Sequence, residues 1–191
     1  MAVVPTLTSR LATGEDAARV ADLVRRAYRE RDGWTSEADL LSDDRIDPDG
    51  VRAKIAAPGS VVLLFEADGQ LLACCEVVQR PEHRAYFGMF AVEPARQAGG
   101  VGRAVLRAAE EFAAAGGATT MEMQVIGQRS DLIAWYERRG YRRSGSRRPF
   151  PYDEVEPELV HRDDLYFLVL EKALSKALEK ALEKAPEKPR D

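Results

Sequence analysis

Residues 97–103 read Gln97-Ala98-Gly99-Gly100-Val101-Gly102-Arg103 and lie between an apolar run that ends at Val92 and an alanine-rich segment with a helical pattern. Glycines in front of a helix let a ligand approach the backbone closely. The first N–H groups of a helix have no partner within it, and the helix dipole places its positive end at the same point. The stretch therefore predicts an anion site, which we interpret as a pyrophosphate loop.

Two common phosphate loops fit this stretch poorly. A mononucleotide P-loop ends in Gly-Lys-Ser/Thr, where the Lys reaches the outer phosphates and the hydroxyl holds magnesium. Here Gly102 is followed by Arg103 and Ala104, which disfavours metal-assisted phosphoryl transfer. A dinucleotide fingerprint lies in the first βα turn of a doubly wound sheet, with an acidic residue about 20 positions later. This stretch lies at mid-chain, after several expected strands.

Length and composition favour a single domain. The chain has 191 residues, of which 45% are hydrophobic, enough for one well-buried core. Its net charge of −4 argues against general binding to nucleic acid. No apolar run is long enough to span a bilayer, so we expect no membrane partner. Cys74 and Cys75 are adjacent and would point to opposite faces of a strand, so we expect buried thiols, no disulfide and a cytoplasmic location.

The hydrophobic pattern predicts strands and helices along the whole chain. Strands are expected over 3–11, 60–67, 71–79, 84–92, 118–126 and 165–170, with further extended structure from 141. Helices are expected over 15–29, 47–57, 100–115 and 131–138, with one more helical turn considered over 36–41. Asp68-Gly69 predicts a hairpin turn. Gly88, inside its strand, suggests a bulge or a close backbone approach.

Motifs in this order resemble one family. The pattern Gln97-x-x-Gly100-x-Gly102 is similar to the acetyl-CoA loop of the GNAT superfamily of N-acetyltransferases. Residues 86–92 (Tyr-Phe-Gly-Met-Phe-Ala-Val) resemble the family's strand before the loop, and residues 134–141 (Ala-Trp-Tyr-Glu-Arg-Arg-Gly-Tyr) resemble its second signature. The resemblance implies an α/β (α+β) class with the GNAT acyl-CoA N-acyltransferase fold, a mixed, mostly antiparallel central sheet flanked by helices. It implies a GNAT domain over 1–170 and a charged helical or disordered tail over 171–191.

The resemblance implies acetyl-CoA (coenzyme A) as the cofactor. Its pantetheine would bond to the strand backbone at Phe90, Ala91 and Val92, in a gap between two splayed strands. Its pyrophosphate would lie on the loop amides, those of Gln97, Ala98, Gly99, Gly100, Val101, Gly102 and Arg103, with the Arg103 side chain as a nearby cation. The reaction implied is direct attack of an amine on the thioester, without a metal, followed by departure of the CoA thiolate.

Tyr136 stands where the family often has a tyrosine that protonates this thiolate. A phenol with a pKa of about 10 is protonated at neutral pH and can act as the general acid. The alternative is a core aromatic on an amphipathic helix, and Trp135 beside it is expected to pack against the core or the cofactor. Arg129 stands where many relatives carry an Asn that contacts the pantetheine or the thiolate, so its role in cofactor binding is left open.

A general base is needed as well, because an alkylammonium with a pKa of about 10.4 must lose its proton before attack. Glu76 and Glu122 are candidates, since each carboxylate lies inside a predicted strand. The alternative for both is a solvent-facing strand residue. Tyr86 stands where some relatives place a catalytic glutamate, so that base is missing here.

The acceptor is expected to lie between the N-terminal and late parts of the chain. Tyr28, Trp34 and Tyr86 are candidates on one side, and Tyr152 and Glu154 on the other, in the long connection after Gly140. Aromatic rings beside carboxylates suit a cationic amine. A group of nearby arginines could equally bind an acidic acceptor or the CoA 3′-phosphate, so the charge of the acceptor stays open: Arg142, Arg143, Arg147 and Arg148.

The function favoured is an N-acetyltransferase that acetylates an amine, most simply that of a small molecule, with acetyl-CoA. A protein or peptide amine is an alternative acceptor. A non-catalytic acyl-CoA sensor is a second alternative, since no base is assured. The Lys-Ala-Leu-Glu repeats after 170 predict a solvated helix or a docking segment for a partner subunit, which would give a homodimer.

Overall fold

The computed structural model describes residues 7–29, 37–42 and 45–174. The strands are β1 (Thr8–Leu11), β2 (Ser60–Ala67), β3 (Gln70–Arg80), β4 (Arg84–Val92), β5 (Thr120–Ile126), β6 (Arg142–Pro149) and β7 (Tyr166–Ala173). The helices are α1 (Ala17–Arg29), α2 (Pro48–Ala56), α3 (Val101–Ala115) and α4 (Ser130–Glu137). The order of strands and helices along the chain is the one predicted from the sequence. The predicted α/β (α+β) class is also confirmed, because the sheet is mostly antiparallel and has helices on both faces.

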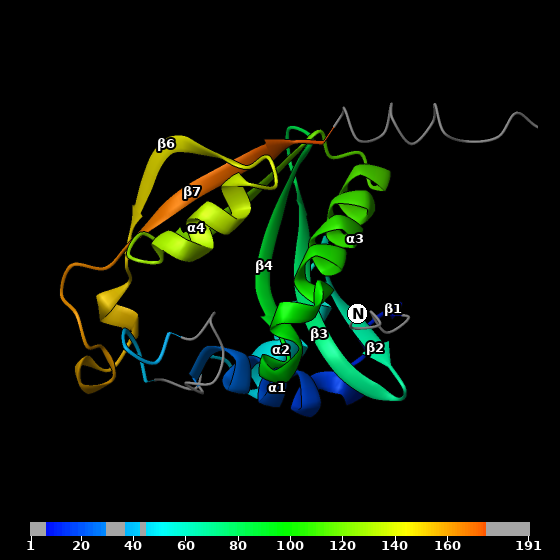
Figure 1. Ribbon diagram of the computed structural model, residues 1–191, viewed down its shortest axis with the longest axis horizontal. Coiled ribbons are helices and arrows are strands. Elements are labelled where there is room, and N and C mark those ends of the chain that lie inside the picture. Colours follow the sequence, from blue (N-terminus) through cyan, green and yellow to red (C-terminus); the bar gives the residue numbers. More distant parts are fainter. Residues whose placement is uncertain (1–6, 30–36, 43–44, 175–191) are drawn as a thin grey trace, which may run out of the picture.

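The described strands form one sheet in the order β1-β2-β3-β4-β5-β7-β6. Its neighbours are antiparallel except β4 and β5, which are parallel and pair only over residues 84–86 and 120–122. Beyond these residues the two strands separate. Figure 1 shows β4 and β7 close together at the top of the view and far apart below it. The sheet therefore consists of a β1–β4 half and a β5–β7 half that are joined at one end.

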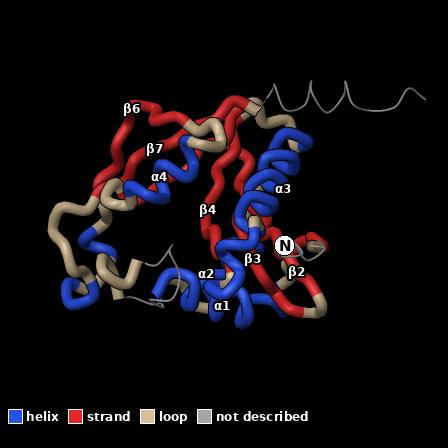
Figure 2. Tube along the Cα trace, viewed as in Figure 1, coloured by secondary structure: helices blue, strands red, loops and turns tan. Residues whose placement is uncertain are grey.

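Helices cover both faces of the sheet (Figure 2). On one face α1 and α2 pack through Val24 and Val51 against β2 residues such as Leu64. On the other face α3 and α4 share a second core, to which they contribute Val105 and Ile133. Helix α3 packs on the β1–β4 half of the sheet, and α4 follows β5 in the other half. The two helices therefore lie on different sides of the gap between β4 and β5, although both contribute to the same core.

A third, smaller core joins the late connection to the segment after α1. Leu41 packs with Phe150 and Leu165 in this core. Backbone bonds also tie the two segments, because the Ser42 N–H donates to the Leu159 carbonyl at 2.9 Å. The connection between β6 and β7 thus fixes residues 37–42 beside the separated strands.

The last strand extends further than the sequence predicted. The last strand was expected to end at Leu170, with a helical tail from 171, but β7 runs to Ala173. Pairing with β5 continues to Thr120, and the Leu174 N–H donates to the Thr119 carbonyl at 2.8 Å. Leu174 is fully buried in the core that α3 covers. The remaining expected tail, 175–191, lies outside the described residues, as does the expected strand start over 3–6.

Cys74 and Cys75 are both free and buried, as expected for small hydrophobic residues. They belong to the cores on opposite faces of the sheet. Burial raises the pKa of the Cys74 thiol to about 12, so it stays protonated. Within the described part of the chain, none of the helices has the length and apolar character needed to cross a membrane.

Candidate active site

Strand β4 carries a bulge just before the glycine loop. Met89 and Phe90 stand opposite the single residue Cys75 of β3. Met89 has a φ of 42°, in the left-handed region, and so departs from regular strand geometry. A Cβ on Gly88 would lie 2.6 Å from Cε1 of Tyr86, which explains why this position is a glycine. The predicted bulge is confirmed, whereas the close neighbour of Gly88 is the Tyr86 side chain and not a backbone.

The bulge lies on the part of β4 that has separated from β5. Among the described strands, none pairs with this edge of β4 beyond Tyr86. The Tyr28 phenol, near the end of α1, donates a hydrogen bond to the Phe90 carbonyl at 2.8 Å. Burial raises the pKa of Tyr28 to about 12, so this donor keeps its proton. An unpaired strand edge offers backbone groups to an extended ligand.

The glycine loop passes from a 3₁₀ turn over Pro94–Gly99 into α3. Gly100 is the N-cap of α3 and has a φ of 82°, which strongly favours glycine. No side chain caps the helix, and a Cβ added at Gly99 or Gly100 would meet nothing within 4 Å. The Gln97 side chain donates to the Val92 carbonyl at 3.2 Å and ties the loop to the end of β4. The N-terminus of α3 is therefore open toward a ligand.

A cavity of about 420 Å³ joins the loop, the bulge and α4. Its lining contains Tyr28, Phe90, Val92, Gln97, Gly99, Gly100, Gly102, Arg103, Leu132, Trp135, Tyr136 and Arg139. The structure thus brings together most of the residues predicted for the cofactor. The side chains of Ala91 and Val101 are instead buried in the two cores, so only their backbone groups are candidates for ligand contact.

Arg139 is a cavity residue that the sequence reasoning missed. Its guanidinium lies 3.6 Å above the Trp135 ring and donates to the Trp135 carbonyl at 2.7 Å. Burial lowers the pKa of Arg139, and the neighbouring cations Arg138 and Arg103 lower it further. Arg139 follows Trp135 by four residues, so their helical spacing could have indicated the stack. The cavity therefore has two cations, Arg103 from α3 and Arg139 after α4.

Tyr136 is buried on α4 between two aromatic neighbours. Its ring centroid lies 5.0 Å from that of Trp135 and 5.7 Å from that of Tyr141. Burial raises its pKa well above the usual value for a phenol. The Tyr136 hydroxyl is therefore protonated over the physiological range and can donate a proton.

A comparison with models of protein families identifies the family of this chain. Residues 18–141 match the model of the family described as "Acetyltransferase (GNAT) family". The chain belongs to this family. The match includes α1, the bulged strand, the glycine loop and α4, and it ends at Tyr141. No curated protein matches the chain at a significant level.

Solved structures of other GNAT proteins have the same fold at low sequence identity. One is yncA, a putative acetyltransferase from Salmonella typhimurium with acetyl-CoA, at 17% identity and a TM-score of 0.64, with 97% of this chain and 98% of that chain covered. A second is the paia N-acetyltransferase of Thermoplasma acidophilum in complex with coenzyme A. Its identity to this chain is 16% and its TM-score is 0.67, with 88% of this chain and 99% of that chain covered. A third is the ribosomal-protein-S18-alanine N-acetyltransferase of Escherichia coli. Its identity to this chain is 16% and its TM-score is 0.66, with 97% of this chain and 100% of that chain covered.

A smaller cavity of about 50 Å³ adjoins the first in this GNAT fold. Tyr28, Phe90, Leu132 and Tyr136 line both cavities. The rest of its lining comes from the walls of the split sheet and the segment after α1: Glu37, Arg45, Tyr86, Phe87, Gly88, Met89, Met123, Gln124, Val125, Ile126 and Phe167. Tyr28 and Tyr86, both predicted to contact the acceptor, are therefore brought together here, and the shared residues include the proton donor proposed from the sequence.

Glu37 in this smaller cavity lies between two arginines. It accepts hydrogen bonds from Arg29 of α1 at 3.3 Å and from Arg129, at the start of α4, at 3.1 Å. The side chains are only 6–10% exposed. The other terminal nitrogen of Arg129, Nη2, is buried without a hydrogen-bond partner. Arg129 does not line the larger cavity, so its predicted contact with the cofactor is not supported by its position.

The two carboxylates considered as general bases lie elsewhere. Glu76 faces α2, where its carboxylate accepts from Lys54 at 2.8 Å and from Ser60 at 3.2 Å. Glu122 accepts from Arg80 at 2.7 Å and from Arg84 at 2.8 Å, at the joined end of β4 and β5. Neither lines either cavity. Their positions do not support the prediction that one of them deprotonates the amine, since both are held in ion pairs outside the two cavities.

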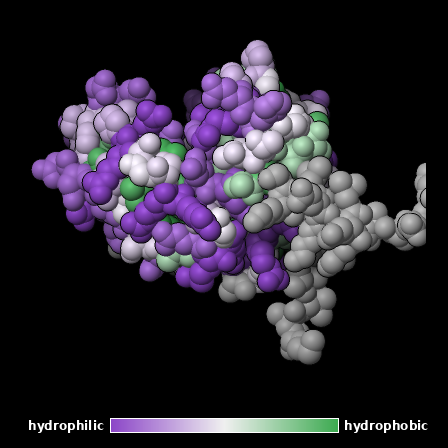
Figure 3. Space-filling model, turned by 90° about the horizontal axis from the view of Figure 1, so that it is seen from above, coloured by the Kyte–Doolittle hydropathy of each residue, from purple (hydrophilic) through white to green (hydrophobic). Residues whose placement is uncertain are grey.

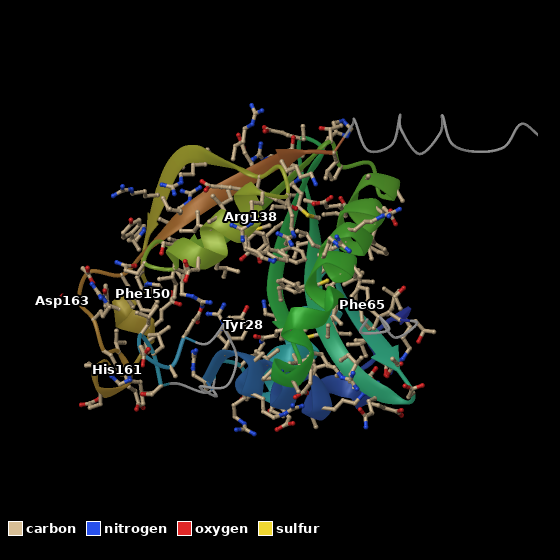
Figure 4. All side chains as sticks on the ribbon, in the orientation of Figure 1. Tyr28, Phe65, Arg138, Phe150, His161 and Asp163 are labelled. Atoms are coloured by element: carbon tan, nitrogen blue, oxygen red, sulfur yellow. The ribbon has the colours of Figure 1, made fainter. Side chains whose placement is uncertain are left out.

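Tyr152 and Glu154 are also remote from these cavities. Tyr152 accepts a bond from the Leu165 N–H at 2.6 Å and so closes the late connection. It lines a separate cavity with His161 and Asp163, and Glu154 lines none of these cavities. Figure 4 shows Phe150, His161 and Asp163 together at the left, whereas Tyr28 lies centrally between the two halves. The positions of Tyr152 and Glu154 in the late connection therefore do not support their predicted contact with the acceptor.

The remaining candidates are the arginines of β6 and Trp34. Every residue of β6 is exposed, and the strand is at the edge of the sheet. The face seen from above is mostly hydrophilic (Figure 3). Arg147 stacks over Tyr166 at 4.6 Å, and Arg143 donates to Glu137 at 2.9 Å. None of these arginines lines the two adjoining cavities. Trp34 lies outside the described residues.

Proposed function

We propose that the protein transfers the acetyl group of acetyl-CoA to an amine of a small molecule, with Tyr136 as the general acid. The observation that carries this proposal is the position of Tyr136, which lines both the cavity beneath the glycine loop and the smaller cavity beside it. A thioester bound in the first and an amine bound in the second would meet at this phenol. Membership of the acetyltransferase family supports the reaction class.

The residues of the larger cavity fit coenzyme A. The open N-terminus of α3 suits a diphosphate, because its amides and helix dipole favour anions. Arg103 and Arg139 add two cations to the same cavity. The free edge of β4 suits the pantetheine amides, and Phe90 and Trp135, whose rings are 6.2 Å apart, give an apolar wall. Two of the similar structures carry acetyl-CoA or coenzyme A.

Acetyl-CoA would supply an activated acetyl thioester. Tyr136 would hold a proton for the departing sulfur, and its raised pKa keeps that proton in place until the sulfur becomes basic. Tyr28 would hold the bulge in shape through its bond to the Phe90 carbonyl. The cavity walls would exclude bulk water from the reacting atoms.

The small volume beside Tyr136 supports a small acceptor. About 50 Å³ holds only a few water-sized groups. One of the similar structures acts on a protein alanine, so the shared fold by itself does not select the acceptor. Among the described residues that line the two cavities there is one carboxylate, Glu37, and it already accepts from two arginines. That observation favours the second candidate function, an acyl-CoA sensor without turnover.

Two measurements test the proposal. Calorimetry with coenzyme A should give saturable binding, and release of free thiol from acetyl-CoA should rise when an accepted amine is added. Tight binding of coenzyme A with no thiol release across a broad amine screen would favour the sensor. No binding of coenzyme A at all would contradict both candidate functions.

A further inference from the structure

The gap between the two halves of the sheet is closed differently on its two faces. On the face covered by α3 and α4, one core contains residues of both halves, such as Phe87 of β4 and Met123 of β5. On the face covered by α1 and α2, the core of the described residues draws its side chains from the β1–β4 half alone. The strands β4 and β5 pair only at the joined end. On the α1 face, the open end therefore depends on other contacts between the halves.

Glu37 makes such a contact. Its carboxylate accepts from Arg29, at the end of α1, at 3.3 Å and from Arg129, which follows β5 and caps α4, at 3.1 Å. The three side chains are only 6–10% exposed. Solvent screens buried charges little, and charge-assisted bonds hold their groups at a defined distance. The carboxylate thus joins an arginine of one half to an arginine of the other.

The segment that carries Glu37 is also held by the second half. Leu41 belongs to the same small core as Ile126, the last residue of β5. Leu41 forms an antiparallel bridge with Val160 of the late connection as well. Residues 37–42 therefore contact both halves at the open end.

Further bonds connect Glu37 to the two sides of the proposed reacting centre. Its N–H donates to the Tyr28 carbonyl at 2.7 Å, and the Tyr28 phenol donates to the Phe90 carbonyl in the bulge at 2.8 Å. On the other side, Arg129 is the N-cap of α4, the helix that carries Tyr136. A continuous series of contacts thus runs from the free edge of β4 to the proposed general acid.

We propose that Glu37 is a positioning residue, which joins Arg29 to Arg129 and so fixes the width of the gap at the open end. This width sets the distance from Tyr136 to a thioester bound along β4. A displacement of about 1 Å between reacting groups can lower a rate by about 10²-fold, so a small widening is enough to matter. The effect on Tyr136 rests on the acetyltransferase function proposed above, whereas the width of the gap does not.

The width of the gap is measured by double electron–electron resonance between two nitroxide labels. Arg25→Cys on α1 and Asp131→Cys on α4 place the labels at exposed positions on the two sides of the gap. The native thiols of Cys74 and Cys75 are buried, so they should not take up the label. The distance between the labels requires neither an acceptor nor turnover.

Glu37→Gln and Arg129→Gln should each shift and broaden the distribution of this distance, because each removes a charge from the buried contact. Glu76→Gln is the matched control. Glu76 is also a carboxylate with 6% exposure, but its partner Lys54 belongs to the same half of the sheet. This control should leave the distribution as in the wild type.

The effect on Tyr136 is measured as a split between kcat and binding. With an amine found in the screen, Glu37→Gln and Arg129→Gln should each lower kcat for thiol release about tenfold or more. The Kd for coenzyme A should stay within about twofold of wild type, since neither side chain lines the larger cavity. The double variant should be no worse than the more affected single variant, because both substitutions break the same contact.

If the distances are unchanged in both variants, or if Glu76→Gln broadens them equally, the role of Glu37 in the gap is overturned. If Glu37→Gln does not unfold cooperatively in urea, Arg129→Gln decides the comparison. If the gap changes but kcat stays within about twofold of wild type, the effect on Tyr136 is overturned. If the wild type binds no coenzyme A or releases no thiol with any amine, the proposed function fails, while the distances still decide whether Glu37 sets the gap.

Discussion

The two ends of β4 have different neighbours. At residues 84–86 the strand pairs with β3 on one side and β5 on the other, and Arg84 donates to Glu122 and Glu171 at 2.8 and 3.2 Å. From Gly88 onward, β3 is its single partner among the described strands, and its free edge faces the cavities. The joined end uses its polar groups for stability, whereas the open end leaves them for a ligand. Variants at the open end should therefore change binding and rate, and variants at the joined end should change stability.

The largest effect is expected for Tyr136→Phe at the open end. Loss of a general acid typically lowers kcat by about 10²–10⁴-fold. Binding of coenzyme A should change little, because the ring that forms the wall remains. Since burial raises the pKa of Tyr136, the wild-type rate should show no alkaline loss from this phenol up to about pH 10, the usual pKa of a tyrosine. Steady-state thiol release as a function of pH measures the fall in kcat and the pH dependence of the wild-type rate.

Tyr141→Phe is the matched control. Its ring lies beside that of Tyr136, but its hydroxyl donates to Glu110 at 3.0 Å inside the core. We expect lower stability and an unchanged kcat. Equal losses of kcat in the two variants would show that Tyr136 acts through packing and would remove the general acid from the mechanism.

The next effect concerns the two ends of α3. Gly100 and Gly117 both have positive φ, at 82° and 92°, and a Cβ at either would meet nothing within 4 Å. Alanine in this backbone region costs about 1–2 kcal/mol, so Gly100→Ala and Gly117→Ala should lower the free energy of unfolding similarly. Only Gly100 lines the larger cavity. We therefore expect about a tenfold rise in the Kd for coenzyme A in Gly100→Ala alone.

Urea unfolding and calorimetry on the same preparations separate the two effects. If both variants weaken coenzyme A binding equally, the loss follows general destabilisation, and the loop has no special role. If neither does, the amides of the loop are not the diphosphate site.

The sequence was informative where the signal is local. The spacing of hydrophobic residues and the turn residues predicted the order of the helices and strands, and the glycines around Gly100 predicted the open helix N-terminus. Both features depend on residues that are close together in the sequence. Tyr136 was found through a motif within one helix. Arg139 was missed although its distance of four residues from Trp135 was visible, because a cation at a helix end is more often solvated.

Contacts between distant segments could not be predicted in this way. Arg129 and Glu37 are 92 residues apart and meet because the late connection holds residues 37–42 in place. The alternation of residues along a strand predicts on which face of the sheet a carboxylate lies, but it does not predict which cation pairs with that carboxylate. For that reason Glu76 and Glu122 could be read as bases, although their partners come from α2 and from neighbouring strands.

The smallest effect on activity is expected for Glu76→Gln, on the face of β3 that α2 covers. The Glu76 side chain is 6% exposed and pairs with Lys54. Glutamine keeps the shape and an acceptor for Ser60 but removes the charge, so the free energy of unfolding should fall by about 1–3 kcal/mol. Values of kcat/KM should stay within about twofold of wild type. Urea unfolding and thiol release measure the two quantities.

Glu122→Gln sharpens the comparison from the joined end. Its partners Arg80 and Arg84 are 40% and 35% exposed, so solvent screens the pair and the cost should be below about 1 kcal/mol. Glu122 is a second control of the same kind as Glu76. It pairs in register with Tyr86, and Glu76 pairs with Gly88, and both of these β4 residues line the smaller cavity. A large fall in kcat in Glu122→Gln with little loss of stability would mean that the joined end takes part in proton transfer, and the division of β4 into a stabilising end and a binding end would have to be abandoned.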